Sequence, residues 1–372
     1  MSKQMNSKSF LRIFLSKIRA GSKVLLFELA RHKKGVLQAI PIAPKSAGIN
    51  VTHNCNSRCI TCNMWRSKST NELTTTELQD ILTQLKDVGV VGVGFEGGEP
   101  LLRNDLPQIV GKAHQLGFET IGMMTNGLLL TKKKAENLIQ KGLTSIGVSI
   151  DGIGETHDFV RGVKGAYEKS TRALEELVDL RNSKYPQLNL HMGTILMKPT
   201  IDDFIPIVDL AHRLRVDFSL QLIDDSLTFF RGIDRGSLWI EEQDKLDGLI
   251  NELHNLKKVN PALKSSTHTR LEYARRYFSD PKRADIPCVL GYLTIYIDAY
   301  GEVYPGCYPL GSVGSLRDKR LKEIIESPEY KRRVQAMFRK ECPGCACGYP
   351  SNLAYSWPAL LNETLWRLKL RS

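Results

Sequence analysis

Three cysteines stand close together in the stretch NVTHNCNSRCITCNMWR. Cys55, Cys59 and Cys62 follow a short apolar run, Gly48 to Val51, that is typical of a buried strand. Three thiols on one loop can converge on one point, and in a reducing cell the main use of a thiolate is to hold a soft metal. A 4Fe–4S cluster normally takes four cysteines. A loop with three would leave one iron open, as a catalytic metal site requires.

Two other uses of these thiols are open at this point. A disulfide with a spare thiol needs an oxidising compartment, which nothing in the sequence indicates. A zinc site of the three-cysteine, one-histidine kind would recruit His53, two residues before Cys55, because these spacings also suit zinc. The residues that follow the loop favour the cluster over zinc.

The second motif with a chemical use is a glycine turn in the stretch VVGVGFEGGEP. A predicted strand from Val90 to Phe95 ends in Gly97, Gly98, Glu99 and Pro100. Adjacent glycines at a strand end let the backbone approach a ligand closely, because no side chain intervenes. Alone, this sequence is more often a simple turn than a site. One strand–helix unit after a cysteine loop, it indicates a ligand-binding turn.

In these two motifs and in their order, the chain resembles the radical S-adenosylmethionine (SAM) enzymes. The resemblance implies a 4Fe–4S cluster on the three loop cysteines, with SAM bound to the open iron. It also implies that Gly97, Gly98 and Glu99 receive the methionine amine of SAM, while Pro100 stiffens the turn. A carboxylate suits an ammonium group through charge-assisted hydrogen bonds. The family often has an aromatic residue where this chain has Thr61, so the packing of the adenine is left unassigned.

Further SAM contacts are implied at the ends of the next two predicted strands. Ser149 and Asp151 match the position that contacts the ribose in the family, and Asn126 of the TNG turn would line the same cleft. Asn-Gly and Asp-Gly also form turns wherever they occur, so turn chemistry is the alternative for two of these residues. Arg103 and Arg161 are candidates for pairing with the SAM carboxylate, or else ordinary surface arginines.

The elements that must position these residues alternate as strands and amphipathic helices from Gly48 onward. Six such repeats predict the α/β class, and the resemblance implies a partial (β/α)6 TIM-like barrel with a C-terminal cysteine-rich SPASM/twitch-like extension. The GGEP, TNG and SIDG motifs all fall at strand ends, where such barrels carry their sites. We divide the chain into a basic amphipathic segment (1–46), a radical SAM core (47–235), a helical linker (236–286), an auxiliary cluster domain (287–350) and a basic amphipathic tail (351–372).

A second group of cysteines lies in the C-terminal part, at Cys288, Cys307, Cys342, Cys345 and Cys347. A predicted hairpin turning at Ala299 to Gly301 separates the first two of them. This arrangement resembles the SPASM or twitch domains that hold auxiliary iron–sulfur clusters. Five thiols would hold one auxiliary 4Fe–4S cluster and leave one thiol spare. A structural zinc is the alternative.

Composition bounds the class of protein. The chain has 372 residues, of which 42% are hydrophobic and 25% charged, the balance of a protein that buries a large core. No stretch approaches the roughly 20 apolar residues of a membrane span, and basic residues interrupt the first apolar segments, unlike a signal peptide. These features predict a cytoplasmic protein.

The net charge is +12, and the excess is greatest near the N-terminus. Phe10 to Leu29 mixes Leu, Ile and Phe with basic residues at roughly helical spacing. Such a segment can lie on an anionic membrane, here the inner membrane surface, or pack on the domain with its basic face in water. No fold motif for nucleic-acid binding accompanies the charge, so no nucleic acid is expected.

The leading hypothesis is an enzyme that reductively cleaves SAM to a 5′-deoxyadenosyl radical and abstracts hydrogen from an unidentified substrate. A peptide or protein, or a phosphorylated or lipid-linked metabolite, would fit. The chemistry needs an external one-electron donor such as flavodoxin or ferredoxin. The rival is a non-catalytic iron–sulfur or zinc-binding protein on the same scaffold, which would have no use for a SAM-binding turn.

Overall fold

The computed structural model describes residues 23–67, 70–223, 234–265, 267–280, 287–342 and 360–361. Residues 1–22 of the predicted basic segment and nearly all of the predicted tail lie outside the described residues. Cys345 and Cys347 also lie outside them. The first described element is helical over residues 23–32, and α2 (Lys34–Ala39) follows it.

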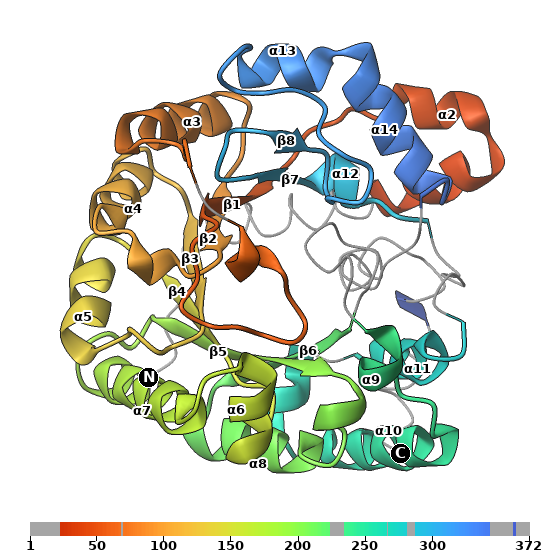
Figure 1. The fold of residues 1–372 in the computed structure, drawn as a ribbon. Helices are drawn as coiled ribbons and strands as arrows, with labels where there is room; N and C mark the ends of the chain where they lie inside the picture. Colours follow the sequence, from red (N-terminus) through yellow and green to blue (C-terminus); the bar gives the residue numbers. More distant parts are fainter. Residues whose placement is uncertain are drawn as a thin grey trace, which may run out of the picture.

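One curved sheet holds the molecule together, with its strands in the order β6-β5-β4-β3-β2-β1-β7-β8 (Figure 1). All neighbours from β6 to β7 pair in parallel, and only β7 and β8 are antiparallel. Because β6 and β8 form the two edges, the barrel is partial, as predicted. The strands are β1 (Ser46–Thr52), β2 (Gly92–Gly97), β3 (Thr120–Thr125), β4 (Ser145–Ser149), β5 (Asn189–Leu196), β6 (Asp217–Leu222), β7 (Thr294–Ile297) and β8 (Val303–Tyr304).

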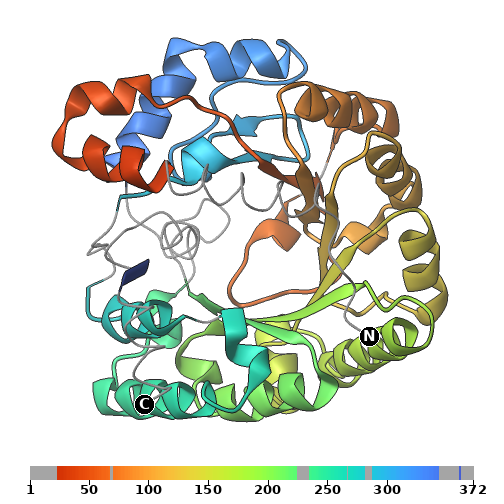
Figure 2. The same ribbon diagram turned by 180° about the vertical axis from the view of Figure 1, so that it is seen from behind.

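Helices cover the outer, convex side of the sheet (Figures 1 and 2). The first of them shows why they form: α3 begins at a capping box, in which Thr74 N donates to Glu77 at 2.7 Å and Glu77 N donates back to the Thr74 hydroxyl at 3.3 Å. Its apolar stripe is then fully buried at Leu78, Leu82 and Leu85. The helices of the barrel are α3 (Thr75–Asp87), α4 (Leu106–Gln115), α5 (Lys132–Gln140), α6 (Glu155–Arg161), α7 (Ala166–Ser183) and α8 (Phe204–Leu214).

The period-two alternation of the strands sorts side chains between the core and the barrel interior. In β2, Val93 and Phe95 are buried against the helices, whereas Glu96 opens into the interior. The short helical turns η1 (Met64–Arg66), η2 (Pro100–Leu102) and η3 (Lys198–Thr200) follow strand ends at the same rim. The carboxyl ends of the strands are therefore where polar groups gather.

The predicted linker region is mostly helical and lies beside the β6 edge (Figure 2). Its elements are α9 (Arg235–Leu238), α10 (Gln243–Leu256), η5 (Pro261–Ser265) and α11 (His268–Tyr277). The hydroxyl of Tyr277 donates to the carbonyl of Ile223 at 2.9 Å, which ties α11 to the end of β6. Periodicity predicts α10 but not α11 or α6.

The C-terminal region extends the barrel sheet. The predicted hairpin is present as β7 and β8, and β7 pairs in parallel with β1, so this region continues the sheet. The helices α12 (Leu290–Leu293), α13 (Leu321–Glu326) and α14 (Pro328–Phe338) accompany it. No helix within the described ranges is both long and apolar enough to cross a bilayer.

Candidate functional site

A cavity of about 310 Å³ lies at the carboxyl ends of the parallel strands. Several residues that the sequence predicts for the site line it together: Cys55, Cys59, Cys62, Gly97, Gly98, Asn126, Ser149 and Arg161. Three other predicted residues, Glu99, Pro100 and Asp151, are not among the described residues that line it. The cysteine loop and the glycine turn thus face one space, although 34 or more positions separate them in the sequence.

Each of the three loop sulfurs accepts a hydrogen bond from a different donor. Ser57 N donates to Cys55 Sγ at 3.4 Å, and Met64 N donates to Cys62 Sγ at 3.4 Å. The guanidinium of Arg161 donates to Cys59 Sγ at 3.7 Å. Donors on sulfur stabilise thiolate ligands and tune the potential of a cluster that they hold.

The electrostatics of the loop call for a bound cation. The pKa of Cys55 and of Cys62 is raised to about 11, chiefly by burial and to a smaller extent by the neighbouring loop cysteines, while a backbone donor on each sulfur opposes the rise. Three half-buried sulfurs this close together therefore become thiolates only when a positive centre compensates for their charge. An all-sulfur donor set of three suits an iron–sulfur cluster, so these residues fit that group.

The cysteine loop is held in place by neighbouring backbone. Arg58 N and Ile60 N donate to the last carbonyls of α6, at Arg161 (2.8 Å) and Val160 (3.0 Å). Gly162, which ends α6 at a φ of +61°, has room for no side chain, because a Cβ there would lie 2.5 Å from the Arg58 carbonyl oxygen. The end of α6, which sequence analysis missed, therefore positions the loop.

The glycine turn lies directly on the root of the cysteine loop. Gly98 N donates to the Thr52 carbonyl and Glu99 N to the Asn54 carbonyl, both at 2.8 Å. A Cβ on Gly97, whose φ is +128°, would lie 2.2 Å from the Thr52 oxygen, and one on Gly98 would lie 2.1 Å from the Asn54 oxygen. Both glycines are thus required by close packing of backbone on backbone.

We expect Gly98→Ala to separate the turn from the cysteine loop, because backbone must move to relieve a 2.1 Å contact. Thermal unfolding should show a loss of about 1–3 kcal/mol, and the reconstituted variant should bind SAM more weakly. Gly193→Ala is the control, since its Cβ would meet nothing closer than Met124 Cε at 3.5 Å. Equal stability and SAM affinity in both variants would contradict this account of the turn.

Glu99 is fully buried and turned away from the cavity into the protein. Its carboxylate accepts three hydrogen bonds: from the Thr125 hydroxyl (2.7 Å), Asn126 N (2.8 Å) and Leu101 N (3.1 Å). Burial raises the pKa of Glu99, and these three donors lower it part of the way back. The contacts of this carboxylate therefore join the GGEP turn to the TNG turn.

Asn126 connects the TNG turn to the cysteine loop. Its amide Nδ2 donates to Asn56 Oδ1 at 2.8 Å and to Ser57 Oγ at 3.0 Å, while its carbonyl accepts the Ser170 hydroxyl at 2.7 Å. Asn126 and Ser149 both line the cavity, as the sequence predicts. The turn chemistry weighed for Asn126 is also present, because Leu128 N donates to its Oδ1.

Asp151 and Arg161 form a buried ion pair beside the cysteine loop. Asp151 Oδ2 lies 2.6 Å from the Arg161 guanidinium, and Ile195 N donates to Oδ1 at 2.9 Å. Burial lowers the pKa of Arg161, but Asp151 and then Cys59 outweigh it and raise the pKa above its ordinary value. Arg161 therefore keeps a positive charge beside Cys59. Arg103, by contrast, pairs with Asp105, and its guanidinium also donates hydrogen bonds to the carbonyls of Val51 and Leu73.

Further cavity residues escaped the sequence analysis. Glu96 faces the cavity, and withdrawal from bulk water inside the barrel raises its pKa. It makes no hydrogen bond or ion pair with any other described residue. Gln221 on β6 and Tyr308 from the C-terminal region line the same space, as does Trp65, whose indole donates to the Cys59 carbonyl at 3.4 Å. Inward positions at strand ends are the signal that could have identified Glu96 and Gln221.

The C-terminal cysteines are only partly described. Cys307 is buried in a small apolar cluster with Leu290 and Met337, and Cys288 packs against it. Cys342 is half-buried, and no cysteine of the described ranges forms a disulfide.

His53, the alternative zinc ligand beside the cysteine loop, does not line the cavity. Its ring packs edge-on against the ring of Tyr300, with 5.0 Å between the ring centroids.

Comparison with known families agrees with this geometry. Residues 49–211 match the Radical SAM superfamily, and residues 288–348 match SPASM, an iron–sulfur cluster-binding domain. The chain belongs to the radical SAM superfamily. The cofactors predicted from the resemblance are confirmed at this level: the radical SAM domain takes a 4Fe–4S cluster and SAM, and the SPASM domain takes auxiliary iron–sulfur clusters.

Curated relatives of this radical SAM protein differ in how much of the chain they share. Fe-coproporphyrin III synthase of Methanosarcina barkeri is 32% identical over 45% of this chain but only 41% of its own length. AdoMet-dependent heme synthase of the same organism is 25% identical over 82% of this chain and 92% of the relative. PqqA peptide cyclase of Bradyrhizobium diazoefficiens is 32% identical over 43% of this chain and 44% of its own.

Solved structures support the fold. Streptococcus suis SuiB bound to S-adenosylmethionine superposes with a TM-score of 0.62 at 18% identity, over 82% of this chain and 72% of SuiB. Native anSMEcpe with bound AdoMet and Cp18Cys peptide gives 0.58 at 19% identity, over 86% and 98% of the two chains. The predicted radical SAM core with a C-terminal SPASM region is confirmed. The domain boundaries and individual site residues stay predictions.

Proposed function

We propose that this protein reductively cleaves SAM and abstracts a hydrogen atom from a substrate in the cavity at the strand ends. When bound, the 4Fe–4S cluster would supply the electron and the open iron that this chemistry needs. The observation that carries the proposal is the shared cavity, in which the three thiols and the glycine turn face polar side chains from other strands. A radical SAM enzyme also needs a reductant, and a flavodoxin or ferredoxin is the proposed donor.

The residues of the site divide into those that would bind the cluster or SAM and those that hold these binding residues in position. Cys55, Cys59 and Cys62 would hold the cluster, and the backbone of Gly97 and Gly98 would meet the methionine end of SAM. Asn126 and Ser149 would face the ribose, and Trp65 offers a flat ring where the family's aromatic residue is replaced by Thr61. Pro100 keeps its predicted role of stiffening the turn.

Glu99 and Asp151 hold in position two residues that line the cavity, Asn126 and Arg161. Glu99 holds the backbone of Asn126, and Asp151 holds Arg161 against Cys59. We keep the contact between Glu99 and the SAM amine, and that between Asp151 and the ribose, as proposals that would need each carboxylate to rotate toward the cavity.

For the substrate we propose a tetrapyrrole, because the heme synthases match this chain along most of both lengths. The net charge of +12 favours an anionic substrate such as a porphyrin carboxylate. A peptide is the second candidate, because PqqA peptide cyclase shares the core of the chain.

Anaerobic incubation with iron-coproporphyrin III tests the substrate proposal. The reconstituted protein, SAM and reductant should form 5′-deoxyadenosine faster with the porphyrin than without it, and the mass of the porphyrin should fall. An unchanged rate and an unchanged porphyrin, in a protein that still cleaves SAM, would remove the tetrapyrrole and leave the enzyme class standing.

We expect Glu96→Gln to separate SAM cleavage from substrate turnover. Glu96 lies close to Tyr308, whose pKa is raised by burial and then by the charge of Glu96. A carboxyl group beside a SPASM-region tyrosine is placed to meet the substrate or to move its proton, so turnover should fall roughly tenfold or more.

Formation of 5′-deoxyadenosine by Glu96→Gln without substrate should stay within about twofold. Glu119→Gln, at the opposite end of the strands just before β3, is the matched control and should change neither rate. A loss of both activities in Glu96→Gln would place this residue at the SAM site instead.

We also propose peripheral contact of the N-terminal segment with an anionic membrane surface. In the helix over residues 23–32, Leu25, Leu26 and Leu29 are 62%, 38% and 44% exposed, while Phe27 is buried. Leucines beside basic residues suit an anionic interface.

Vesicle co-sedimentation tests this contact. The protein should sediment with vesicles containing phosphatidylserine and not with pure phosphatidylcholine, and replacing the three exposed leucines by serine should abolish the effect. Substituting these exposed side chains is preferable to deleting the segment, because Phe27 belongs to the core. Equal sedimentation of the two proteins would end the membrane proposal.

A further inference from the structure

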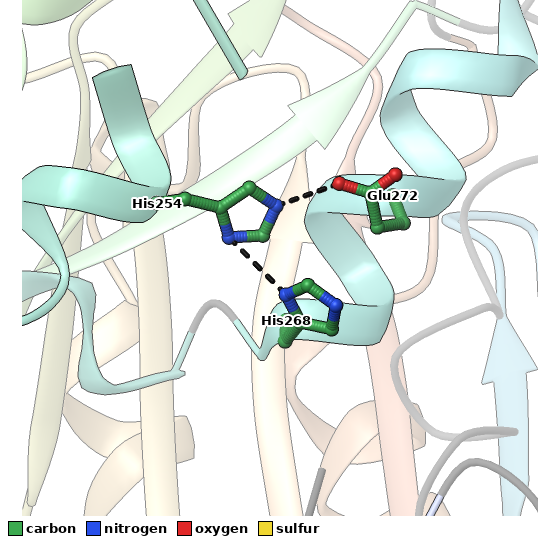
Figure 3. A group of neighbouring side chains, drawn as sticks. All are labelled: His254, His268 and Glu272. Carbon is green, nitrogen blue, oxygen red and sulfur yellow. Dashed lines mark hydrogen bonds and ion pairs between the residues drawn. The ribbon is translucent and has the colours of Figure 1, made fainter. Parts of the chain in front are cut away.

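Two histidines and a glutamate meet between α10 and α11, on the β6 side of the barrel (Figure 3). His254 comes from the last turn of α10. His268 is the first residue of α11, and Glu272 follows one turn later on the same face, four residues on. One ligand atom from each of the three side chains lies within 4.8 Å of the other two, and all three residues are half-buried.

The three side chains already form a chain of polar contacts. His254 Nε2 lies 2.7 Å from Glu272 Oε1, and the Nδ1 atoms of the two histidines are 3.3 Å apart (Figure 3). The second distance is close to the separation of roughly 3.4 Å between two nitrogen ligands on a tetrahedral zinc ion with bonds of about 2.0–2.1 Å. Small rotations of the side chains would bring all three to one ion.

The charges around the cluster also suit a divalent cation. Glu272 brings a carboxylate to the two imidazoles, and its two oxygens meet different partners, His254 at Oε1 and Arg275 at Oε2. Arg275 donates to Glu272 Oε2 at 3.2 Å and pairs with Asp247, so it fixes the carboxylate by one oxygen and leaves Oε1 directed at His254. A metal-bound carboxylate or histidine is usually held by such an outer contact.

We propose that His254, His268 and Glu272 bind a zinc ion or a similar divalent transition metal. Two imidazoles and one carboxylate are a donor set that zinc accepts, with water in the fourth position. Each neutral imidazole binds the ion through its unprotonated ring nitrogen and keeps its N–H, and a histidine that is protonated before binding releases that extra proton to solvent. The site is independent of the cysteine clusters, because it contains no sulfur.

Such an ion would stabilise a region on which the barrel edge depends. It would join the last turn of α10 to the first turns of α11, and α11 is tied through Tyr277 to the end of β6. Gln221, on β6, lines the cavity described above. The ion therefore has a structural role beside the substrate side of the barrel.

Zinc binding should be measured on tag-free protein whose cysteine sites have first been filled with iron and sulfide. After dialysis against zinc, the protein should retain one zinc per chain, and X-ray absorption at the zinc edge should show only nitrogen and oxygen neighbours at about 2.0–2.1 Å. The thermal midpoint should rise with zinc and return with a chelator. No retained zinc, or a sulfur shell near 2.3 Å, would overturn the proposal.

Two variants make the assignment specific. Glu272→Gln keeps the size of the side chain and should weaken zinc binding about 10–100-fold, and the double variant His254→Asn/His268→Gln should retain no zinc. His212→Gln, which removes an exposed histidine of α8, is the control and should bind like the original protein. Equal zinc content in the double variant and the control would show that the cluster is only a hydrogen-bonded contact between helices.

Discussion

A Cys59→Ser variant is expected to lose the cluster of the barrel and all formation of 5′-deoxyadenosine. The three loop sulfurs face one cavity, and the loop sequence from Asn54 to Arg66 contains no further cysteine that could replace Cys59. A serine oxygen is a harder and far less acidic ligand than a thiolate and does not replace it on iron. Iron content should fall by about four atoms per chain.

The fold of the Cys59→Ser variant should persist, since Arg161 keeps its ion pair with Asp151. Circular dichroism of the two apoproteins checks this point. Thr61→Ser is the control, because it alters a cavity-lining residue of the same loop and leaves all three sulfurs in place. Formation of 5′-deoxyadenosine by Cys59→Ser, at a rate near that of Thr61→Ser, would show that this cysteine is not a cluster ligand.

Glu99→Ala is expected to be the most destabilising single change at the site. It removes a fully buried carboxylate and leaves the Asn126 and Leu101 amides and the Thr125 hydroxyl without their acceptor. Each orphaned buried group costs about 1–3 kcal/mol, so a loss of about 3–5 kcal/mol is expected. Denaturant unfolding of the apoprotein measures it without interference from the cluster.

Glu99→Gln separates the hydrogen bonds from the charge. Glutamine keeps one acceptor oxygen but turns an NH2 group toward a backbone donor, so it should lose less stability than alanine and more than a surface change such as Glu119→Gln. If Glu99 acts only on the SAM amine, both Glu99 variants should unfold like the original protein and differ from it in SAM affinity alone. That outcome would contradict the supporting role inferred here.

The repeating elements were readable from the sequence because they depend on local patterns. The apolar runs from Gly48 to Val51 and from Val90 to Phe95 predict the first two strands to within about two residues of β1 and β2. The cysteine loop and the GGEP turn were also readable, since each is a short motif whose spacing carries its chemistry. These motifs led to the superfamily that the comparisons confirm.

Contacts between distant segments could not be read in the same way. A GGE motif does not reveal whether its carboxylate faces a cavity or the protein, and that of Glu99 is held inward by Thr125 and Asn126. The pairing of Asp151 with Arg161 depends on where α6 ends. The parallel pairing of β7 with β1 depends on the whole barrel, since nearly 250 positions separate the two strands.

The central claim is that three cysteines and an adjacent glycine turn form one SAM-cleaving site. The most direct test is the anaerobic reconstituted protein, with its iron and sulfide content verified, mixed with SAM and a strong reductant. We expect 5′-deoxyadenosine and methionine to form, with no such products from the Cys59→Ser variant prepared in parallel. A fully loaded protein that forms neither product, or one that takes up zinc and no iron at the loop cysteines, would contradict the claim.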